Sequence, residues 1–232
     1  MSRMHAFNRG EAFVKIDLVK QVAEYYGAEA NDYDAAQGKP ERLREVAKIG
    51  KTLAHLFSGL RVLEIACGTG TWTEFIAQSA KSVMATDVNQ EMLDIASVKL
   101  AKFTNIEFQL KDGYRLDFGA ATFNAVFCGL WISHVPRQML ATFLVQVRSL
   151  LESGDFVVIV DHRFVQDEMI PLTGSTDAEG NSFSSRCTSD GRSWLITKNF
   201  LNEDEIRTTM TSVFKDVSIE SYRHFWVAKC LV

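Results

Sequence analysis

The 232-residue sequence lacks the cysteine patterns that build disulfide frameworks and zinc sites. Its four cysteines, Cys67, Cys128, Cys187 and Cys230, are widely separated. They form neither a C-x-x-C pair nor a His/Cys cluster with the spacing of zinc ligands. We therefore expect reduced thiols in the core or in loops, and no metal site.

Long apolar runs are also missing. The longest ones, such as Phe156 to Val160, are far too short to span a bilayer, and the N-terminal residues contain no apolar stretch of signal-peptide length. These absences predict a cytoplasmic protein with no membrane partner.

An excess of positive charge is absent as well. The formal net charge is -4, from 25 Lys and Arg against 29 Asp and Glu. A general nucleic-acid-binding surface would need clustered basic residues, so we predict no nucleic-acid partner and favour a small-molecule ligand. With 47% apolar and 23% charged residues, the composition is that of a globular chain with a sizeable core.

Neither an internal repeat nor a linker divides the chain, so the sequence predicts a single domain over residues 1–232. Within it we expect an N-terminal helical cap (1–58), a cofactor-binding core (59–162), a substrate loop (163–200) and a last helix with an edge hairpin (201–232). The sequence carries no signature of an oligomeric state.

Short apolar runs alternate with amphipathic segments from about residue 60 onward, which is typical of βαβ units in a parallel sheet. Predicted strands cover 61–66, 82–87, 106–110, 124–129, 156–160, 215–220 and 225–230. Predicted helices cover 71–80, 90–103 and 137–151, and the spacing of Leu43, Val46, Ile49, Leu53 and Leu56 predicts an earlier one. The expected fold class is α/β, with a doubly wound, mostly parallel seven-stranded sheet, helices on both faces and a C-terminal antiparallel hairpin.

Residues 163 to about 198 form an unusually long connection, rich in Gly, Ser and Thr, before the last helix. Connections of this length are usually disordered or functional. This one begins at the carboxyl end of a parallel strand, where open α/β sheets bind ligands. Two interpretations stay open: a lid over the substrate and a passive surface loop.

The segment RVLEIACGTGTW is the most informative in the chain. An apolar strand ends in Gly68-Thr69-Gly70 and runs into a helix, so backbone N–H groups can face a ligand at close range. Asp87 ends the next predicted strand about 20 positions after Gly68, where a carboxylate can accept both hydroxyls of a ribose. A dinucleotide such as NAD and S-adenosylmethionine both satisfy this pattern.

Two residues favour S-adenosylmethionine. The third glycine of the dinucleotide fingerprint would fall at Thr73, so that fingerprint is incomplete. Glu64, in the strand before the loop, places an acid near the cationic end of S-adenosylmethionine, where a pyrophosphate would be repelled. An NAD-linked oxidoreductase and a noncatalytic binding domain on the same fold remain as alternatives.

Several segments resemble the motifs of class I S-adenosylmethionine-dependent methyltransferases, a family with a Rossmann-like fold. VLEIACGTGTW resembles the first motif, MATDVNQEMLDIA the second and FNAVFCGLWISHVP the fourth, with KDGYRLDF between them. LLESGDFVVIVD resembles the usual helix, turn and fifth strand. The resemblance runs from about Tyr25 to the C-terminus, although Ala66 stands where this family commonly has a third glycine.

The resemblance implies where the cofactor contacts the chain. Asp87 would bind the ribose and Met92 would lie near the adenine, whose amino group would meet Asp112 with help from Gly113. The cofactor-binding residues that we expect are Tyr33, Glu64, Ala66, Cys67, Gly68, Gly70, Trp72, Asp87, Val88, Met92, Asp112, Gly113, Tyr114, Gly129 and Leu130.

Other segments are similar to a small-molecule subgroup that includes phosphonate O-methyltransferases. These segments are YYGAEANDYD, WISHVP, SRCTSDGRSWLITKNF and FWVAKC. The similarity implies O-methylation of a carboxylate or phosphonate in secondary metabolism, whereas N- or C-methylation of a small metabolite stays open. The substrate-binding residues that we expect are Tyr26, Trp131, His134, Arg186, Arg192, Lys198 and Phe225.

His134 is the candidate catalytic base because it follows the fourth strand at the ligand-binding edge. A carboxylate or phosphonate oxygen needs no base, whereas a hydroxyl or a protonated amine does. The alternative is a local hydrogen bond that orders the turn before Pro136. Among the cations, Arg192 is the preferred partner for an anionic substrate. The other histidines, His5, His55, His162 and His224, show no recognisable constellation.

Overall fold

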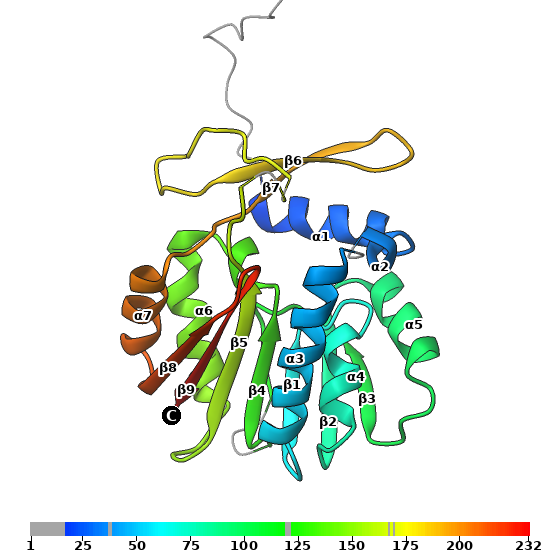
Figure 1. Ribbon diagram of the computed structural model, residues 1–232, viewed down its shortest axis with the longest axis vertical. Helices are drawn as coiled ribbons and strands as arrows, with labels where there is room; N and C mark the ends of the chain where they lie inside the picture. The colour runs from blue at the N-terminus through cyan, green and yellow to red at the C-terminus, as the bar shows by residue number, and fades with distance from the viewer. Residues whose placement is uncertain (1–16, 37–38, 119–121, 167, 169) are drawn as a thin grey trace, which may run out of the picture.

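The computed structural model describes residues 17–36, 39–118, 122–166, 168 and 170–232. In this part of the chain, a seven-stranded sheet in the order β3-β2-β1-β4-β5-β9-β8 carries helices on both faces (Figure 1). Its strands are β1 (Arg61–Ile65), β2 (Ser82–Asp87), β3 (Ile106–Leu110), β4 (Ala125–Gly129), β5 (Phe156–His162), β8 (Lys215–Ser221) and β9 (Phe225–Leu231). Strands β1 to β5 pair in parallel, and β9 and β8 follow as the predicted antiparallel hairpin. The predicted Rossmann-like fold class is confirmed.

Seven α-helices and one short 3-10 helix are present among the described residues. They are α1 (Leu18–Glu29), α2 (Tyr33–Ala36), α3 (Pro40–Leu56), α4 (Thr71–Ala77), α5 (Gln90–Lys99), η1 (Ile132–His134), α6 (Arg137–Ser149) and α7 (Glu203–Thr211). Helices α4, α5 and α6 lie within the predicted ranges and each ends two to four residues early, because the chain turns off toward the next strand.

The core lies on both faces of the sheet because the middle strand, β4, is apolar and buried at every position. Successive side chains of β4 point to opposite faces. Ala125 and Phe127 pack with residues of α3 and α4, whereas Val126 and Cys128 pack with residues of α6 and α7. This alternation fixes which face each helix covers and directs the carboxyl ends of the parallel strands to one edge.

Helix α3 buries most of its predicted apolar stripe. Ile49 and Leu53 are fully buried against the sheet, as their spacing predicts. Leu43 was expected on the same buried face, but it is 49% exposed. The first turn of α3 rises past the sheet toward α2, so this end of the stripe has no strand to cover it (Figure 1).

A cap layer lies across the carboxyl ends of the parallel strands (Figure 1). It consists of α1, α2 and a separate two-stranded antiparallel sheet of β6 (Phe183–Cys187) and β7 (Ser193–Thr197). Trp194 and Ile196 of β7 pack on Val22 of α1, and the backbone N–H of Leu195 donates to Gln21 Oε1 at 3.3 Å.

The β6–β7 hairpin is a structural element that the sequence analysis did not predict. We expected a loop over 163–200 because the segment is rich in Ser, Thr and Gly. The period-2 pattern of S-W-L-I-T places Trp194 and Ile196 on one side, where α1 buries them. That pattern was the signal for a strand, and the composition of the preceding residues obscured it.

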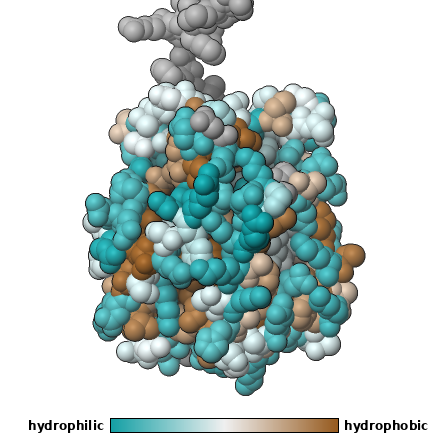
Figure 2. Space-filling view, in the orientation of Figure 1, coloured by the Kyte–Doolittle hydropathy of each residue, from teal (hydrophilic) through white to brown (hydrophobic). Residues whose placement is uncertain are grey.

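The face in Figure 2 is mainly hydrophilic, with apolar side chains scattered over it. Large exposed apolar residues such as Val98 and Val145 lie on different helices and form no single patch. Among the described residues, we find no helix with the length and apolar character needed to cross a membrane.

Candidate active site

The loop after β1 adopts left-handed backbone at three positions. Ala66, Gly68 and Gly70 have φ values of 55°, 55° and 81°. A Cβ added at Gly70 would lie 2.7 Å from Leu100 Cδ1, whereas one at Gly68 would have no neighbour within 4 Å. Gly70 therefore allows α4 to pack against α5, and Gly68 leaves open space in front of the loop.

Asp87 is held at the end of β2 by two backbone donors. The N–H of Gly68 donates to Oδ2 and that of Asn89 donates to Oδ1, each at 2.9 Å. The carboxyl is 7% exposed, and burial raises its pKa above the usual range. Each oxygen retains a free lone pair, so the fixed carboxylate can accept two neighbouring hydroxyls.

A cavity of about 300 Å³ opens in front of this loop and is covered by α1. Most of the predicted cofactor residues line it, together with three predicted substrate residues and the start of α1. The cofactor residues are Tyr33, Ala66, Gly68, Asp87, Val88, Met92, Asp112, Gly113, Tyr114, Gly129 and Leu130; the substrate residues are Tyr26, Trp131 and His134. We refer to this space as the cofactor cavity.

Four predicted cofactor residues lie away from this cavity. Cys67 and Trp72 line a smaller neighbouring space of about 70 Å³, and neither Glu64 nor Gly70 is on the wall of either space. Trp72 is a packing residue in this structure: a Cβ added at Gly129 would lie 2.6 Å from its Cδ1. Its indole therefore supports the strand end that forms the cavity floor.

Glu64 is a buried acid with an unsatisfied oxygen. The residue is 1% exposed, its Oε2 has no hydrogen-bond partner among the described residues, and burial raises its pKa to about 8. A nearby cation would supply the missing partner and favour the ionised form.

The hydrogen bonds of His134 define its protonation state. Its Nδ1 lies 2.8 Å from the carbonyl oxygen of Thr197, which can only accept, so Nδ1 carries the proton. Nε2 must then accept the hydrogen bond from the Tyr26 hydroxyl at 2.8 Å. Burial, reinforced by the charge of Lys198, lowers the pKa of His134 well below its usual range. His134 is a neutral imidazole whose one free nitrogen is already engaged.

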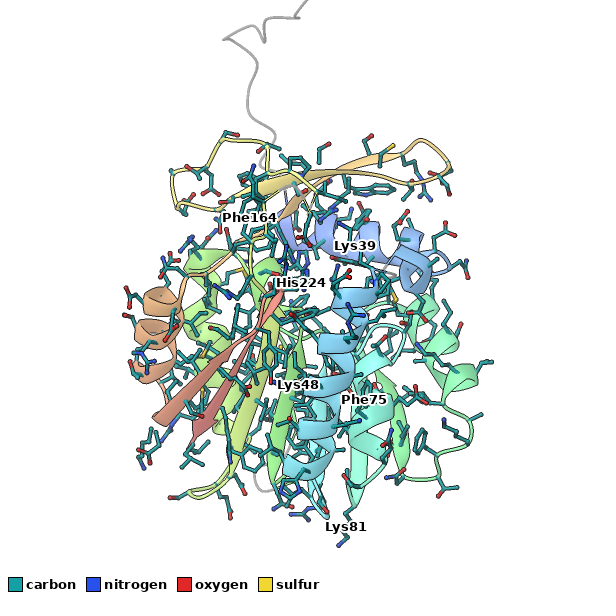
Figure 3. The ribbon with its side chains drawn as sticks, in the orientation of Figure 1. Lys39, Lys48, Phe75, Lys81, Phe164 and His224 are labelled. Atoms are coloured by element: carbon teal, nitrogen blue, oxygen red, sulfur yellow. The ribbon has the colours of Figure 1, made fainter. Side chains whose placement is uncertain are left out.

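A second cavity, of about 230 Å³, adjoins the cofactor cavity. Tyr26, Tyr33, Leu130 and His134 line both spaces and form their common wall. Figure 3 labels two other wall residues, Lys39 and His224, between the cap layer and the upper end of the sheet. We refer to this space as the basic cavity.

Two acids, Glu29 and Glu168, and four cations line the basic cavity. One cation, Lys39, is exposed; the other three are Arg42 of α3, Arg186 of β6 and Lys198 after β7. Across the described residues, none of these three forms an ion pair, and the Nε atoms of both arginines are buried without a hydrogen-bond partner. Burial lowers the pKa of Lys198 to about 8 and that of Arg42 below its usual value. Buried cations without a counter-charge are costly, and an anion would relieve that cost.

His162 lies between two of these cations. Its Nε2 contacts the Arg42 guanidinium and its Nδ1 lies 3.3 Å from Lys198 Nζ. A neutral imidazole has only one acceptor nitrogen, so one of the two cations faces an N–H instead. The ring also stacks on Phe225 at a centroid distance of 5.3 Å. Phe225 itself is fully buried and supports the cavity from behind.

The structure does not bring Arg192 to the basic cavity. Its guanidinium lies 2.7 Å from Asp190 and 5.2 Å from the centre of the Trp194 ring, and its side chain is 60% exposed. It lines only a shallow space on the outer side of α1. Of the three loop cations named from the sequence, Arg186 and Lys198 are brought together and Arg192 is not.

Sequence reasoning missed Arg42 and His162. His162 is the last residue of β5, at the carboxyl edge of the sheet, and this position could have singled it out. Arg42 lies in the first turn of α3, where a basic residue is ordinarily solvated, so no signal in the sequence distinguished it.

Comparison with known proteins identifies the family of this chain. Residues 62–154 match the family described as methyltransferase domain. The chain shares 30% identity with DhpI in the DhpI–SAH complex, covering 92% of this chain and 96% of that one with a TM-score of 0.71. The chain belongs to the class I S-adenosylmethionine-dependent methyltransferases. This methyltransferase is also similar to the chain in the DhpI–SAM–HEP complex. The two share 27% identity with a TM-score of 0.74, over 93% of this chain and 98% of that one.

A curated relative is more distant. A demethylmenaquinone methyltransferase of Lactococcus lactis is 28% identical to the methyltransferase over 149 residues, which are 61% of this chain and 58% of that protein. The chain therefore spans less than two thirds of the length of the curated relative that it matches.

The family determines the cofactor. The enzyme uses S-adenosylmethionine, so the NAD-linked oxidoreductase and the noncatalytic binding domain are no longer alternatives. The residues on the cavity wall fit this group: Asp87 offers two free lone pairs, and Gly68 leaves open space in front of the loop.

Proposed function

We propose that this methyltransferase transfers a methyl group to an oxygen of a small anionic acceptor, a phosphonate or a carboxylate, bound in the basic cavity. The observation that carries the proposal is the cluster of Arg42, Arg186 and Lys198, which have no carboxylate partner among the described residues and adjoin the cofactor cavity. Guanidinium and ammonium groups recognise phosphonate and carboxylate oxygens directly. The similarity of the late segment to phosphonate O-methyltransferases supports the same acceptor class.

The common wall defines where the reaction would occur. When bound, S-adenosylmethionine supplies an activated methyl group on a sulfonium. Tyr26, Tyr33, Leu130 and His134 face both cavities, so they border the passage between methyl donor and acceptor. The chain's contribution is to align the two molecules and exclude water, which suffices for an in-line displacement.

An anionic acceptor also fits the state of His134. An ionised phosphonate or carboxylate oxygen has no proton to lose. His134 Nε2 already accepts the Tyr26 proton, and its lowered pKa makes it a weak base. We propose that His134 orients Tyr26 rather than removing a proton. N-methylation of a protonated amine would need that base, which makes it the less favoured alternative.

In the cofactor cavity, we propose that Asp87 binds the ribose hydroxyls and that Met92, Asp112 and Gly113 surround the adenine. Gly129 and Leu130 end β4 beside the methyl donor and separate it from the basic cavity. These roles follow the family motifs and the positions of the residues on the cavity wall.

The test is formation of S-adenosylhomocysteine with methylphosphonate, small carboxylates and small amines as candidate acceptors. Arg186→Met should raise the Michaelis constant for the best anionic acceptor roughly tenfold or more, because a charged hydrogen bond is worth about 1.5–3 kcal/mol. Arg192→Met is the matched control, since Arg192 belongs to the same hairpin and lies outside the cavity. Turnover with amines alone, or equal effects of the two variants, would contradict the proposal.

A further inference from the structure

We infer that Ser133 and Asp161 are positioning residues that aim the Lys198 ammonium into the basic cavity. The inference rests on the proposed function, because it concerns how that cavity holds an anion. Neither Ser133 nor Asp161 lies on the wall of the basic cavity, so neither would touch the acceptor.

Asp161 is a buried carboxylate near the end of β5; His162 Nδ1 lies 3.7 Å from its Oδ1, and no Lys or Arg in the described part of the chain forms an ion pair with it. It is 1% exposed. The backbone N–H of Ser133 donates to Oδ2 at 2.8 Å, while the Ser133 hydroxyl and the backbone N–H of His162 donate to Oδ1 at 2.9 and 2.7 Å. These donors hold the Asp161 carboxyl group in one orientation inside the fold.

The Ser133 hydroxyl connects this carboxylate to Lys198. Lys198 Nζ lies 2.7 Å from Ser133 Oγ and, as an ammonium, can only donate. Oγ must therefore accept from Lys198 and give its single proton to Asp161. Both hydrogen bonds therefore have a fixed direction: Lys198 donates to Ser133, and Ser133 donates to Asp161.

This arrangement leaves Lys198 charged and available. A direct ion pair with Asp161 would largely neutralise the ammonium charge. With the Ser133 hydroxyl between them, the carboxylate is farther from Nζ and attracts it more weakly. Burial lowers the pKa of Lys198 to about 8, and the Asp161 charge limits that fall. Nζ also lies 3.4 Å from His134 Nε2, which already accepts from Tyr26, and 3.3 Å from His162 Nδ1, and both histidines line the basic cavity.

Charged and titratable groups of five other elements lie around Lys198, and beside burial its pKa responds to Asp161, Arg186 and Arg42. The surrounding groups are His134 of η1, Asp161 and His162 of β5, Arg42 of α3, Arg186 of β6 and Tyr26 of α1. Two further acids, Glu29 and Glu168, line the same cavity, but Asp161 is the carboxylate that raises the pKa of Lys198. Removing the charge of Asp161 should therefore shift the titration of Lys198 to lower pH, a change that a purely structural role for Asp161 would not produce.

The experiment measures sulfate binding to the enzyme loaded with S-adenosylhomocysteine, by calorimetry between about pH 6 and pH 10. Sulfate stays a dianion throughout this range, so the pH dependence belongs to the protein. In the wild type, affinity should fall as the pH rises past about 8. Asp161→Asn should move this fall to lower pH by about one unit, and Ser133→Ala should weaken binding about tenfold at low pH, with recovery in Ser133→Thr.

The variants distinguish a failure of the positioning role from a failure of the proposed anion site. If Lys198→Met weakens sulfate binding but Asp161→Asn and Ser133→Ala leave both affinity and pH dependence unchanged, the positioning role is wrong and the anion site stands. If Lys198→Met binds sulfate as the wild type does, the proposed anion site itself is wrong. S-adenosylhomocysteine affinity and urea unfolding of each variant show that the fold is retained.

Discussion

Ala66 adopts a left-handed backbone, with a φ of 55°, at the first position of the cofactor loop. This conformation costs a residue with a Cβ roughly 1–2 kcal/mol, and glycine avoids that cost. Because glycine also gains freedom in the unfolded chain, Ala66→Gly should raise the free energy of unfolding by about 0.5–1 kcal/mol. Urea unfolding measures it. Ala141→Gly, at an exposed position within α6, is the control and should lower stability by about 1 kcal/mol; similar losses in both variants would refute the strain at Ala66.

Glu64 predicts a pH dependence of stability in the ligand-free enzyme. Burial raises its pKa from an ordinary 4.5 to about 8, so folding favours the protonated form. The stabilisation is fully present below pH 4.5 and is lost as the pH rises to about 8, at roughly 1.4 kcal/mol per pKa unit. Glu64→Gln should flatten this decline, as measured by urea unfolding across the range. The same slope in both proteins would show that Glu64 titrates normally.

Among the elements, the β6–β7 hairpin carries Arg186 and leads directly to Lys198, so the basic cavity depends on how the hairpin is held. Trp194 anchors it, since this side chain is 9% exposed and packs on Val22 of α1. Truncating a buried aromatic residue typically costs about 3–5 kcal/mol where it is packed, and here the loss should fall on the cap layer alone.

We therefore expect Trp194→Ala to speed amide hydrogen exchange in α1, β6 and β7 and to weaken acceptor binding. Exchange in β1 and β4 serves as the internal control and should be unchanged, because the sheet core does not include Trp194. Faster exchange throughout the sheet would show that the cap and the sheet unfold together.

At the scale of the whole molecule, cofactor binding should stabilise the native state measurably. S-adenosylhomocysteine at about 100 times its dissociation constant should add about 2.7 kcal/mol and raise the Tm. Asp87→Ala should reduce this shift at the same concentration because it removes the proposed ribose acceptor. NAD is the control ligand and should give no shift. An undiminished shift in the variant would place the ribose elsewhere.

The sheet could be predicted from the sequence because its central strands are continuous apolar runs, as in β4 and β5, bounded by turn residues. The glycine loop and Asp87 were recognisable for a related reason: their residue types follow from local backbone geometry. Both signals lie within short stretches of chain.

The basic cavity, which is the proposed acceptor site, was harder to predict because its residues come from segments that are far apart in the sequence. Arg42 and His162 are 120 positions apart, and nothing local in either segment reports the contact. Arg192 shows the opposite error: its residue type and its loop suggested an anion site, but Asp190, two positions away, already pairs with it. Which cations remain free is decided by tertiary packing.

The two cavities draw on different parts of the chain. The matched family segment, 62–154, supplies most of the cofactor cavity, whereas Arg42, Arg186 and Lys198 all lie outside it. Substitutions at these three positions, none of which lines the cofactor cavity, can therefore alter the charge of the basic cavity while the donor site is preserved. On the proposed function, the range of acceptors could therefore change in evolution without loss of the cofactor site. Replacing the three cations with neutral or acidic residues would be the way to engineer binding of neutral or cationic molecules.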